Sequence, residues 1–260
     1  MKYLALLLSI IVFTCTAAEA QDWAKERLNK SPRHLDWVTV KRGDRGIKCF
    51  IAYPEVKDKA TSVLVIHEIF GLSDWVRGVC DQLAAAGYIA IAPDLLSGKP
   101  GEDSSKYEGI DAQRKAITSL PPEQVEGDLK AVSDYVSRLP AANGKLAVAG
   151  FCWGGTQTFR FGTNNPSIKS AFVFYGTAPE SSADLARIGT PVYGFYGEKD
   201  ARVTSTVDKT AAAMKENSKQ YDPKIYAGAG HGFMRSGEAP DADAANKTAR
   251  AQSWERLESI

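Results

Sequence analysis

The chain has 260 residues, of which 44 % are hydrophobic and 24 % are charged, and its formal net charge is +1. This composition is typical of a globular protein that is long enough for one domain with a substantial core. The balanced charge argues against nucleic-acid binding, which needs a surplus of Lys and Arg to neutralise phosphates.

The first twenty residues, MKYLALLLSIIVFTCTAAEA, have the layout of a secretory signal peptide: a lysine near the start, an apolar run over residues 3–13 and small residues at the end. The apolar run is shorter than the roughly 20 residues that cross a bilayer, which disfavours a membrane anchor. The residues before Cys15 fit a lipoprotein signal poorly. We therefore predict cleavage after Ala20 and export to the periplasm or the medium, with no membrane contact afterwards.

The remaining chain alternates between strand-like and helical patterns. After a polar lead-in over residues 21–36, we expect strands at 37–40, 46–54, 61–70, 87–94, 145–151, 168–176, 191–197 and 223–230. Helical spacing predicts helices at 74–86, 154–163, 204–217 and 241–258, and one that starts at Pro121-Pro122 and reaches Leu139.

This order predicts an α/β fold, with a mostly parallel central sheet of about eight strands and helices on both faces. The first two strands lack a helix between them, so we expect an antiparallel ribbon at the start. No linker divides residues 37–260, which indicates one domain. The irregular segment 96–109 follows the end of a strand, where a long loop is functional or disordered and is placed to form a wall or lid of a cleft.

Three cysteines, Cys49, Cys80 and Cys152, would remain after signal cleavage. Cys80 follows helical spacing, and Cys49 alternates with apolar residues on one face of a strand, so both are typical of buried core thiols. A disulfide between them stays open, because the sequence cannot supply its geometry. Cys152 has no such packing explanation.

Cys152 lies in the segment Gly-Phe-Cys-Trp-Gly-Gly (150–155), between an expected strand and an expected helix. The pattern is the nucleophile elbow G-x-S-x-G with Cys in place of Ser, although a glycine-rich turn without chemistry would look similar. Glycines relieve crowding at such a sharp turn, and the helix N-terminus favours a thiolate. Asp200 and His231 follow the last two expected strands, and nucleophile, acid and histidine is the chain order of the α/β-hydrolase triad.

A metal site and a cofactor are not expected. His67-Glu68 begins like the zinc motif H-E-x-x-H, but position 71 is Gly and no second His is near in sequence.

Five motifs together resemble the dienelactone hydrolase family, also called carboxymethylenebutenolidases: HEIFG (67–71), APDL (92–95), GFCWGG (150–155), GEKD (197–200) and AGHGFMR (229–235). The similarity runs from about Trp37 to the C-terminus. It implies an α/β-hydrolase fold and a hydrolase that cleaves a carboxylic ester or lactone through a thioester. The implied substrate is small, dienelactone-like and carboxylate-bearing.

The resemblance also implies catalytic roles for four residues. Cys152 would be the nucleophile, His231 the base and Asp200 the residue that orients the base. Glu68 would be the family's second acidic residue, which holds the resting thiol and helps to ionise it when substrate arrives.

Four further residues receive binding roles from the resemblance. The backbone N–H groups of Trp153 and Ile69 would form the oxyanion hole. Arg235 matches a family arginine that binds the substrate carboxylate, and Arg114 is a looser match for a second one.

Some departures and alternatives bear on the substrate. Gly232 stands where family members often have Ser, Trp153 is bulkier than the usual residue, and the export signal is unlike that of cytoplasmic members. A broader esterase or thioesterase could use the same triad, a non-catalytic binding protein could share the fold, and a redox-sensing thiol would need a resolving cysteine. We expect a monomer or small homo-oligomer.

Overall fold

The computed structural model describes residues 22–98 and 102–260, so the expected signal peptide lies outside the described residues. No helix within those two ranges is long and apolar enough to cross a membrane. Eight strands form one sheet: β1 (His34–Arg42), β2 (Arg45–Tyr53), β3 (Ala60–Ile66), β4 (Ile89–Pro93), β5 (Ala142–Phe151), β6 (Ile168–Phe174), β7 (Val192–Gly197) and β8 (Tyr221–Tyr226).

The strand order is β1-β2-β4-β3-β5-β6-β7-β8. β1 and β2 form an antiparallel hairpin, with Gly43 at a positive φ of 57° in its turn. β2 also runs antiparallel to β4, and the other neighbouring strands are parallel. The expected mostly parallel sheet that opens with an antiparallel ribbon is confirmed.

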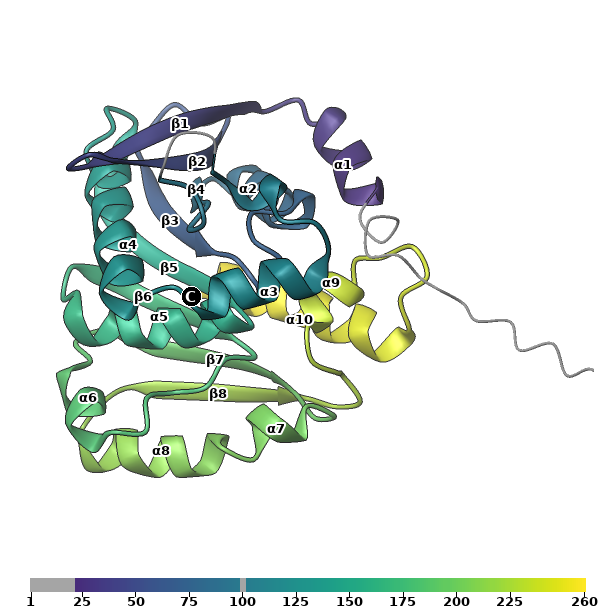
Figure 1. The fold of residues 1–260 in the computed structure, drawn as a ribbon. Coiled ribbons are helices and arrows are strands. Elements are labelled where there is room, and N and C mark those ends of the chain that lie inside the picture. The colour runs from purple at the N-terminus through teal and green to yellow at the C-terminus, as the bar shows by residue number, and fades with distance from the viewer. Residues whose placement is uncertain (1–21, 99–101) are drawn as a thin grey trace, which may run out of the picture.

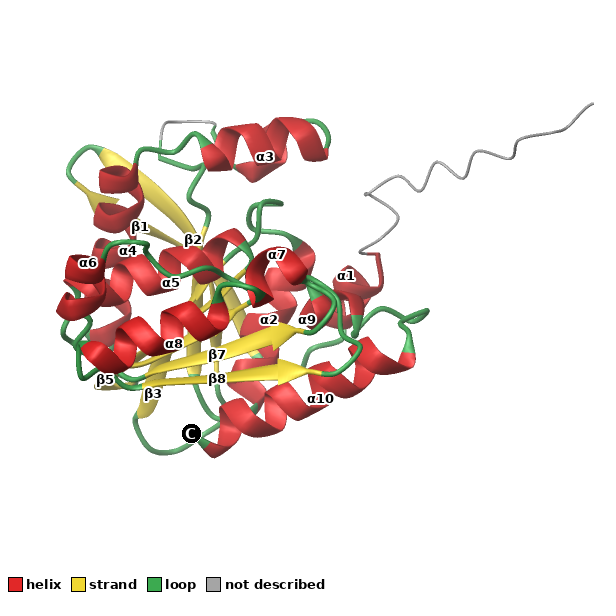
Figure 2. Ribbon diagram, turned by 90° about the horizontal axis from the view of Figure 1, so that it is seen from below, coloured by secondary structure: helices red, strands yellow, loops and turns green. Residues whose placement is uncertain are grey.

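Helices cover both faces of the sheet (Figures 1 and 2). One face packs against α1 (Asp22–Asn29), α2 (Asp74–Ala85), α9 (Phe233–Ser236) and α10 (Ala244–Ser259). The other packs against α4 (Pro122–Ser137), α5 (Trp153–Asn164), α6 (Ser182–Arg187) and α8 (Val207–Glu216). Since side chains alternate along a strand, β5 gives Ala149 and Phe151 to the first face and Leu146 and Val148 to the second. Two-sided burial explains why its sequence is almost continuously apolar.

The same alternation separates the two core thiols. Cys49 on β2 faces the side of the sheet covered by α4, whereas Cys80 on α2 lies on the opposite side. Both are buried and free. The sheet between them therefore excludes the disulfide that the sequence had left open.

Several boundaries differ from the expectations. The lead-in contains α1, which buries Ala24 and Leu28, and β1 starts at His34, so the expected domain start at residue 37 falls inside a strand. The helix α3 (Ile110–Thr118) was not expected, and it stands out from the body of the fold at the top of Figure 2. The expected helix 204–217 is two helices, α7 (Ala201–Thr204) and α8.

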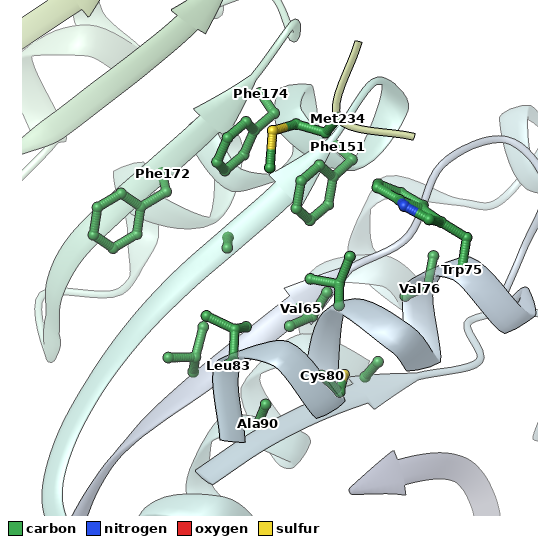
Figure 3. Packing of buried hydrophobic residues seen from close by; sticks show 14 of the residues in the cluster. Val65, Trp75, Val76, Cys80, Leu83, Ala90, Phe151, Phe172, Phe174 and Met234 are labelled. Carbon is green, nitrogen blue, oxygen red and sulfur yellow. The ribbon is translucent and has the colours of Figure 1, made fainter. Parts of the chain in front are cut away.

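The core beneath the end of β5 is aromatic. Phe151 stacks on Phe174 with ring centroids 4.6 Å apart and meets Trp75 edge-on at 5.1 Å, and Met234 packs beside them (Figure 3). Because Phe151 is fully buried and immediately precedes Cys152, this packing anchors the turn that presents the thiol.

Candidate active site

The predicted catalytic residues gather at the carboxyl ends of the parallel strands, where open α/β sheets bind ligands. Glu68 and Ile69 follow β3, which ends at Ile66, four residues before the expected end. Cys152 follows β5, Asp200 follows β7 and His231 follows β8. The fold therefore brings together segments that are far apart in the sequence.

The turn at Cys152 is strained and can form only because glycines surround it. Cys152 has a φ of 56° and a ψ of −115°, which non-glycine residues rarely adopt. A Cβ atom on Gly150 would lie 2.1 Å from the Gly154 carbonyl oxygen, and one on Gly154 would lie 2.3 Å from that of Ile66. A Cβ atom on Gly155 would lie 2.6 Å from the Phe174 carbonyl oxygen. Each glycine thus allows α5 to approach the sheet closely.

Gly154→Ala is therefore expected to lower the free energy of unfolding by about 3 kcal/mol, because the clash is with backbone that cannot move aside. The matched control is Gly78→Ala in α2, where no atom lies within 4 Å of the new methyl group. That change should raise stability by about 0.5–1 kcal/mol through helix propensity. Urea unfolding measures both, and equal effects of the two substitutions would contradict this account of the turn.

Cys152, His231 and Asp200 form a hydrogen-bonded chain. Nε2 of His231 lies 3.1 Å from the Cys152 sulfur, and Nδ1 lies 2.5 Å from Oδ2 of Asp200. Because a carboxylate can only accept, we assign the ring proton to Nδ1, which leaves the Nε2 lone pair facing the thiol. Asp200 is buried, so it holds the ring in one orientation. The arrangement can remove a proton from Cys152 and return it.

The thiol is protonated at rest. Burial, with a further contribution from the negative charge of Glu68, raises the pKa of Cys152 to about 11. The amide of Trp153 and the charges of Arg202 and Arg235 act in the opposite direction and are outweighed. The helix N-terminus at Cys152 favours a thiolate, but burial and the charge of Glu68 outweigh it.

Glu68 is buried and is held by an arginine. Its Oε2 accepts a hydrogen bond of 2.8 Å from Nε of Arg235, whose guanidinium also lies 4.9 Å from the ring centroid of Phe70. Glu68 also raises the pKa of the buried Tyr175 hydroxyl, although burial is the larger cause. Arg235 is thus engaged with Glu68 in this structure.

His67 has a structural role beside the site. It is fully buried, its Nδ1 lies 2.7 Å from the backbone oxygen of Glu68, and its Nε2 accepts from the amide of Leu95 at 3.4 Å. Desolvation lowers the pKa of His67, so the ring is neutral. It stacks on Trp153 with centroids 5.6 Å apart, which fixes both residues next to the thiol. The residues that the structure describes contain no cluster that could hold a metal ion.

A cleft of about 500 Å³ opens above the thiol, and we call it the thiol cleft. Cys152, His231, Ile69 and Trp153 all line it, so the two residues expected to provide the oxyanion-hole amides flank the nucleophile. Its size suits a small organic ligand.

Arg114 does not reach the thiol cleft. It lies on α3, is exposed and pairs with Asp111 at 2.8 Å. Thr118, one turn further along the same helix, lines the cleft instead. None of the described residues of the segment 96–109 lines the cleft. The wall that this segment was expected to form comes from α3 instead.

The sequence did not predict several residues that line the cleft, among them Tyr175, Arg160 and Arg202. Tyr175 directly follows β6 and has a positive φ of 41°, and its ring meets that of His231 edge-on with centroids 5.0 Å apart. Its place at the carboxyl end of a strand was a usable signal. Arg160 and Arg202 carry no such signal, because only the folded chain shows which helical arginines face the thiol.

Comparisons with known proteins show what the chain is similar to. A family model described as the dienelactone hydrolase family matches residues 47–260. A curated protein of Salmonella typhimurium, provisionally named as a carboxymethylenebutenolidase, is 31 % identical over 195 residues, which is 71 % of this chain and 72 % of that protein. A protein of the same provisional name from Synechocystis is 28 % identical over 239 residues and covers 86 % of this chain and 94 % of its own length.

One solved structure is similar to this chain over almost the whole length of the solved protein. The crystal structure of a provisionally named dienelactone hydrolase from Klebsiella pneumoniae superposes with a TM-score of 0.77 and 26 % sequence identity. The match covers 87 % of this chain and 97 % of that one. The two chains therefore share one fold over most of their length.

Proposed function

Because the chain belongs to the dienelactone hydrolase family and is a carboxylic ester hydrolase, we propose that it cleaves esters or lactones through a Cys-His-Asp triad and a thioester intermediate. The observation that carries the proposal is the hydrogen-bonded chain from the Cys152 sulfur through His231 to Asp200. Covalent acyl transfer needs a nucleophile, a base within reach of it and a residue that orients the base. Here the base, His231, lies 3.1 Å from the sulfur of the nucleophile, and the orienting residue is buried.

Acylation would begin when the Cys152 thiol gives its proton to Nε2 of His231 and the sulfur attacks the carbonyl carbon. The tetrahedral oxyanion would accept hydrogen bonds from the backbone amides of Ile69 and Trp153. Its collapse breaks the carbon–oxygen bond, and the leaving oxygen takes the proton from His231. An ester releases its alcohol at this step, whereas the leaving oxygen of a lactone stays part of the acyl group.

Deacylation would repeat the same proton transfers with water. His231 takes a proton from a water molecule, the hydroxide attacks the thioester carbonyl, and the sulfur leaves with the proton returned by His231. The product is a carboxylic acid, or a hydroxy acid when the substrate is a lactone.

Glu68 and Arg235 would control when the thiol ionises. At rest the nearby carboxylate opposes a thiolate, which keeps Cys152 in its protonated and less oxidisable form. A substrate that draws Glu68 or its charge away from the sulfur would favour ionisation. Such protection suits an exported protein, and we also propose export, on the signal-peptide layout of residues 1–20.

Alkylation with iodoacetamide tests the reactive thiol. The label is expected on Cys152 only, with a rate that rises with pH through a midpoint near 11, since the thiolate is the reacting form. Cys49 and Cys80 are buried and their pKa values are raised by burial, so they should stay unlabelled in the folded protein. A small lactone should slow the labelling, and peptide mapping identifies the site.

Glu68→Gln should speed this labelling roughly tenfold at pH 8, because loss of a neighbouring negative charge lowers the pKa of the thiol by about one unit. The control is Glu216→Gln at the exposed end of α8, which should leave the rate unchanged. Labelling at another cysteine, or slower labelling of the Glu68 variant, would contradict the proposed control of the thiol.

A further inference from the structure

The thiol cleft is lined by two arginines that no described carboxylate neutralises. Arg202 lies on α7, two residues after Asp200, and Arg160 lies on α5. Both are exposed, and neither forms an ion pair or a side-chain hydrogen bond with any residue in the described ranges. The described residues that line this cleft include no Asp or Glu. A positively charged cleft without its own counter-ion attracts anionic ligands.

The two arginines act at different distances from the thiol. The charge of Arg202 reaches Cys152, where it favours the thiolate. Cys152, Thr156 and Arg160 are spaced by four, which places them along one face of α5, and Thr156 and Arg160 both line the cleft. Eight residues of helix separate the backbone of Arg160 from that of Cys152 by about 12 Å. A long arginine side chain could therefore meet a group several bonds from the reacting carbonyl.

The cleft continues past Arg160 into a second cavity of about 610 Å³, which we call the outer compartment. The two share Thr156, Gln157, Arg160 and Thr177, and Thr177 is fixed by its amide donating to Oγ1 of Thr156 at 3.0 Å. The outer compartment also contains three carboxylates, Glu126, Glu180 and Asp184, and one further arginine, Arg187, which is paired with Asp184. An anion is thus favoured in the thiol cleft and disfavoured further out.

The two arginines expected from the resemblance are occupied elsewhere. Arg235 is bound to the buried Glu68, and Arg114 pairs with Asp111 on an exposed helix face. Neither lines the thiol cleft. Resting on the thioester mechanism above, we propose that Arg202 and Arg160 form the subsite for a carboxylate carried by the acyl part of the substrate, and so determine specificity.

Two matched substrates test this subsite. Mono(p-nitrophenyl) adipate carries a carboxylate at the far end of its acyl chain, and its methyl ester is the neutral counterpart. The readout is the ratio of kcat/KM for the anionic ester to that for the neutral one, because any effect on the thiol itself cancels. Arg202→Gln and Arg160→Gln should each lower the ratio by about tenfold, the usual effect of losing one charge-assisted contact.

Two arginine variants serve as controls. Arg187→Gln removes a charge from the outer compartment that is already paired with Asp184 at 2.7 Å, and it should leave the ratio within twofold of wild type. Arg114→Gln should also leave the ratio within twofold. An unchanged ratio in the Arg202 and Arg160 variants, or a lowered one in the Arg114 variant, would overturn the subsite.

The failure of the subsite and the failure of the mechanism are distinguishable. Cys152→Ala should abolish turnover of both esters. If that variant keeps its activity, the thioester mechanism is wrong whatever the arginine variants do. If it is inactive while the ratio is unaffected by Arg202 and Arg160, only the subsite is wrong.

Discussion

Replacing Cys152 with alanine is expected to lower kcat for an activated ester by at least about 10⁴-fold, with the fold intact. The expected loss is this large because the substitution removes the atom that would bond to the substrate, and the cost of losing a triad nucleophile is of this order. Hydrogen bonds from the oxyanion hole alone would give only residual turnover. Steady-state hydrolysis of p-nitrophenyl acetate measures the loss.

Cys80→Ala is the matched control for the loss of a thiol. Cys80 is buried on α2 and lines neither the thiol cleft nor the outer compartment, so kcat should change by less than about twofold. Stability will fall slightly, because a small cavity is left. Retention of wild-type turnover by Cys152→Ala, with Cys80→Ala equally active, would refute a role for Cys152 as nucleophile.

The second large effect is expected for Asp200→Asn, which should lower kcat by roughly 10³–10⁴-fold at neutral pH. The Asp200 carboxylate holds the His231 proton on Nδ1 through the 2.5 Å hydrogen bond. An asparagine can present its NH₂ group to Nδ1 instead, which moves the proton to Nε2. The nitrogen that faces Cys152 then cannot accept the thiol proton.

The pH profile separates this explanation from simple misfolding. Since the thiol has a pKa of about 11, hydroxide can replace the missing base as the pH rises, and the deficit of Asp200→Asn should shrink toward that value. The control Asp134→Asn changes an exposed carboxylate of α4 that pairs with Lys130 and should keep wild-type kcat. A deficit that is constant from pH 7 to pH 10 would contradict the tautomer explanation.

Much of the fold was predictable because its signals are local and strong. The apolar runs of β3 and β5 and the four-and-three spacing of α4 identify elements whose faces are buried. Among the helices that were not predicted, α1 and α3 were missed for the opposite reason. α1 buries only Ala24 and Leu28, and α3 buries only Ile117, so their sequences are dominated by polar residues.

The site was predictable where the chemistry requires a particular backbone conformation. Glycines are required around Cys152 because a Cβ atom at any of the three positions would lie 2.1–2.6 Å from a neighbouring carbonyl oxygen, and this requirement leaves a recognisable pattern in the sequence. The sequence around the arginines of the site has no comparable pattern. Whether Arg114, Arg160 or Arg202 faces the thiol depends on how α3, α5 and α7 sit on the sheet, which no short segment encodes.

The ionisation state of the thiol could be predicted from the sequence only in part. A helix N-terminus favours a thiolate, whereas the role that the resemblance implies for Glu68 is to hold the resting thiol until substrate arrives. Burial and the charge of Glu68 act the other way and dominate, but both depend on residues that the fold brings in from β3. The outcome follows from the balance of these effects and not from the motif.

The most direct test of the mechanism is the mass of the enzyme during its first turnover. Wild-type protein mixed with p-nitrophenyl acetate and quenched in acid before one turnover is complete should carry one acetyl group, and peptide mapping should find it on Cys152 as a thioester. The Cys152→Ala protein should carry none. An acetyl group on another residue during productive turnover would contradict the proposed thioester intermediate.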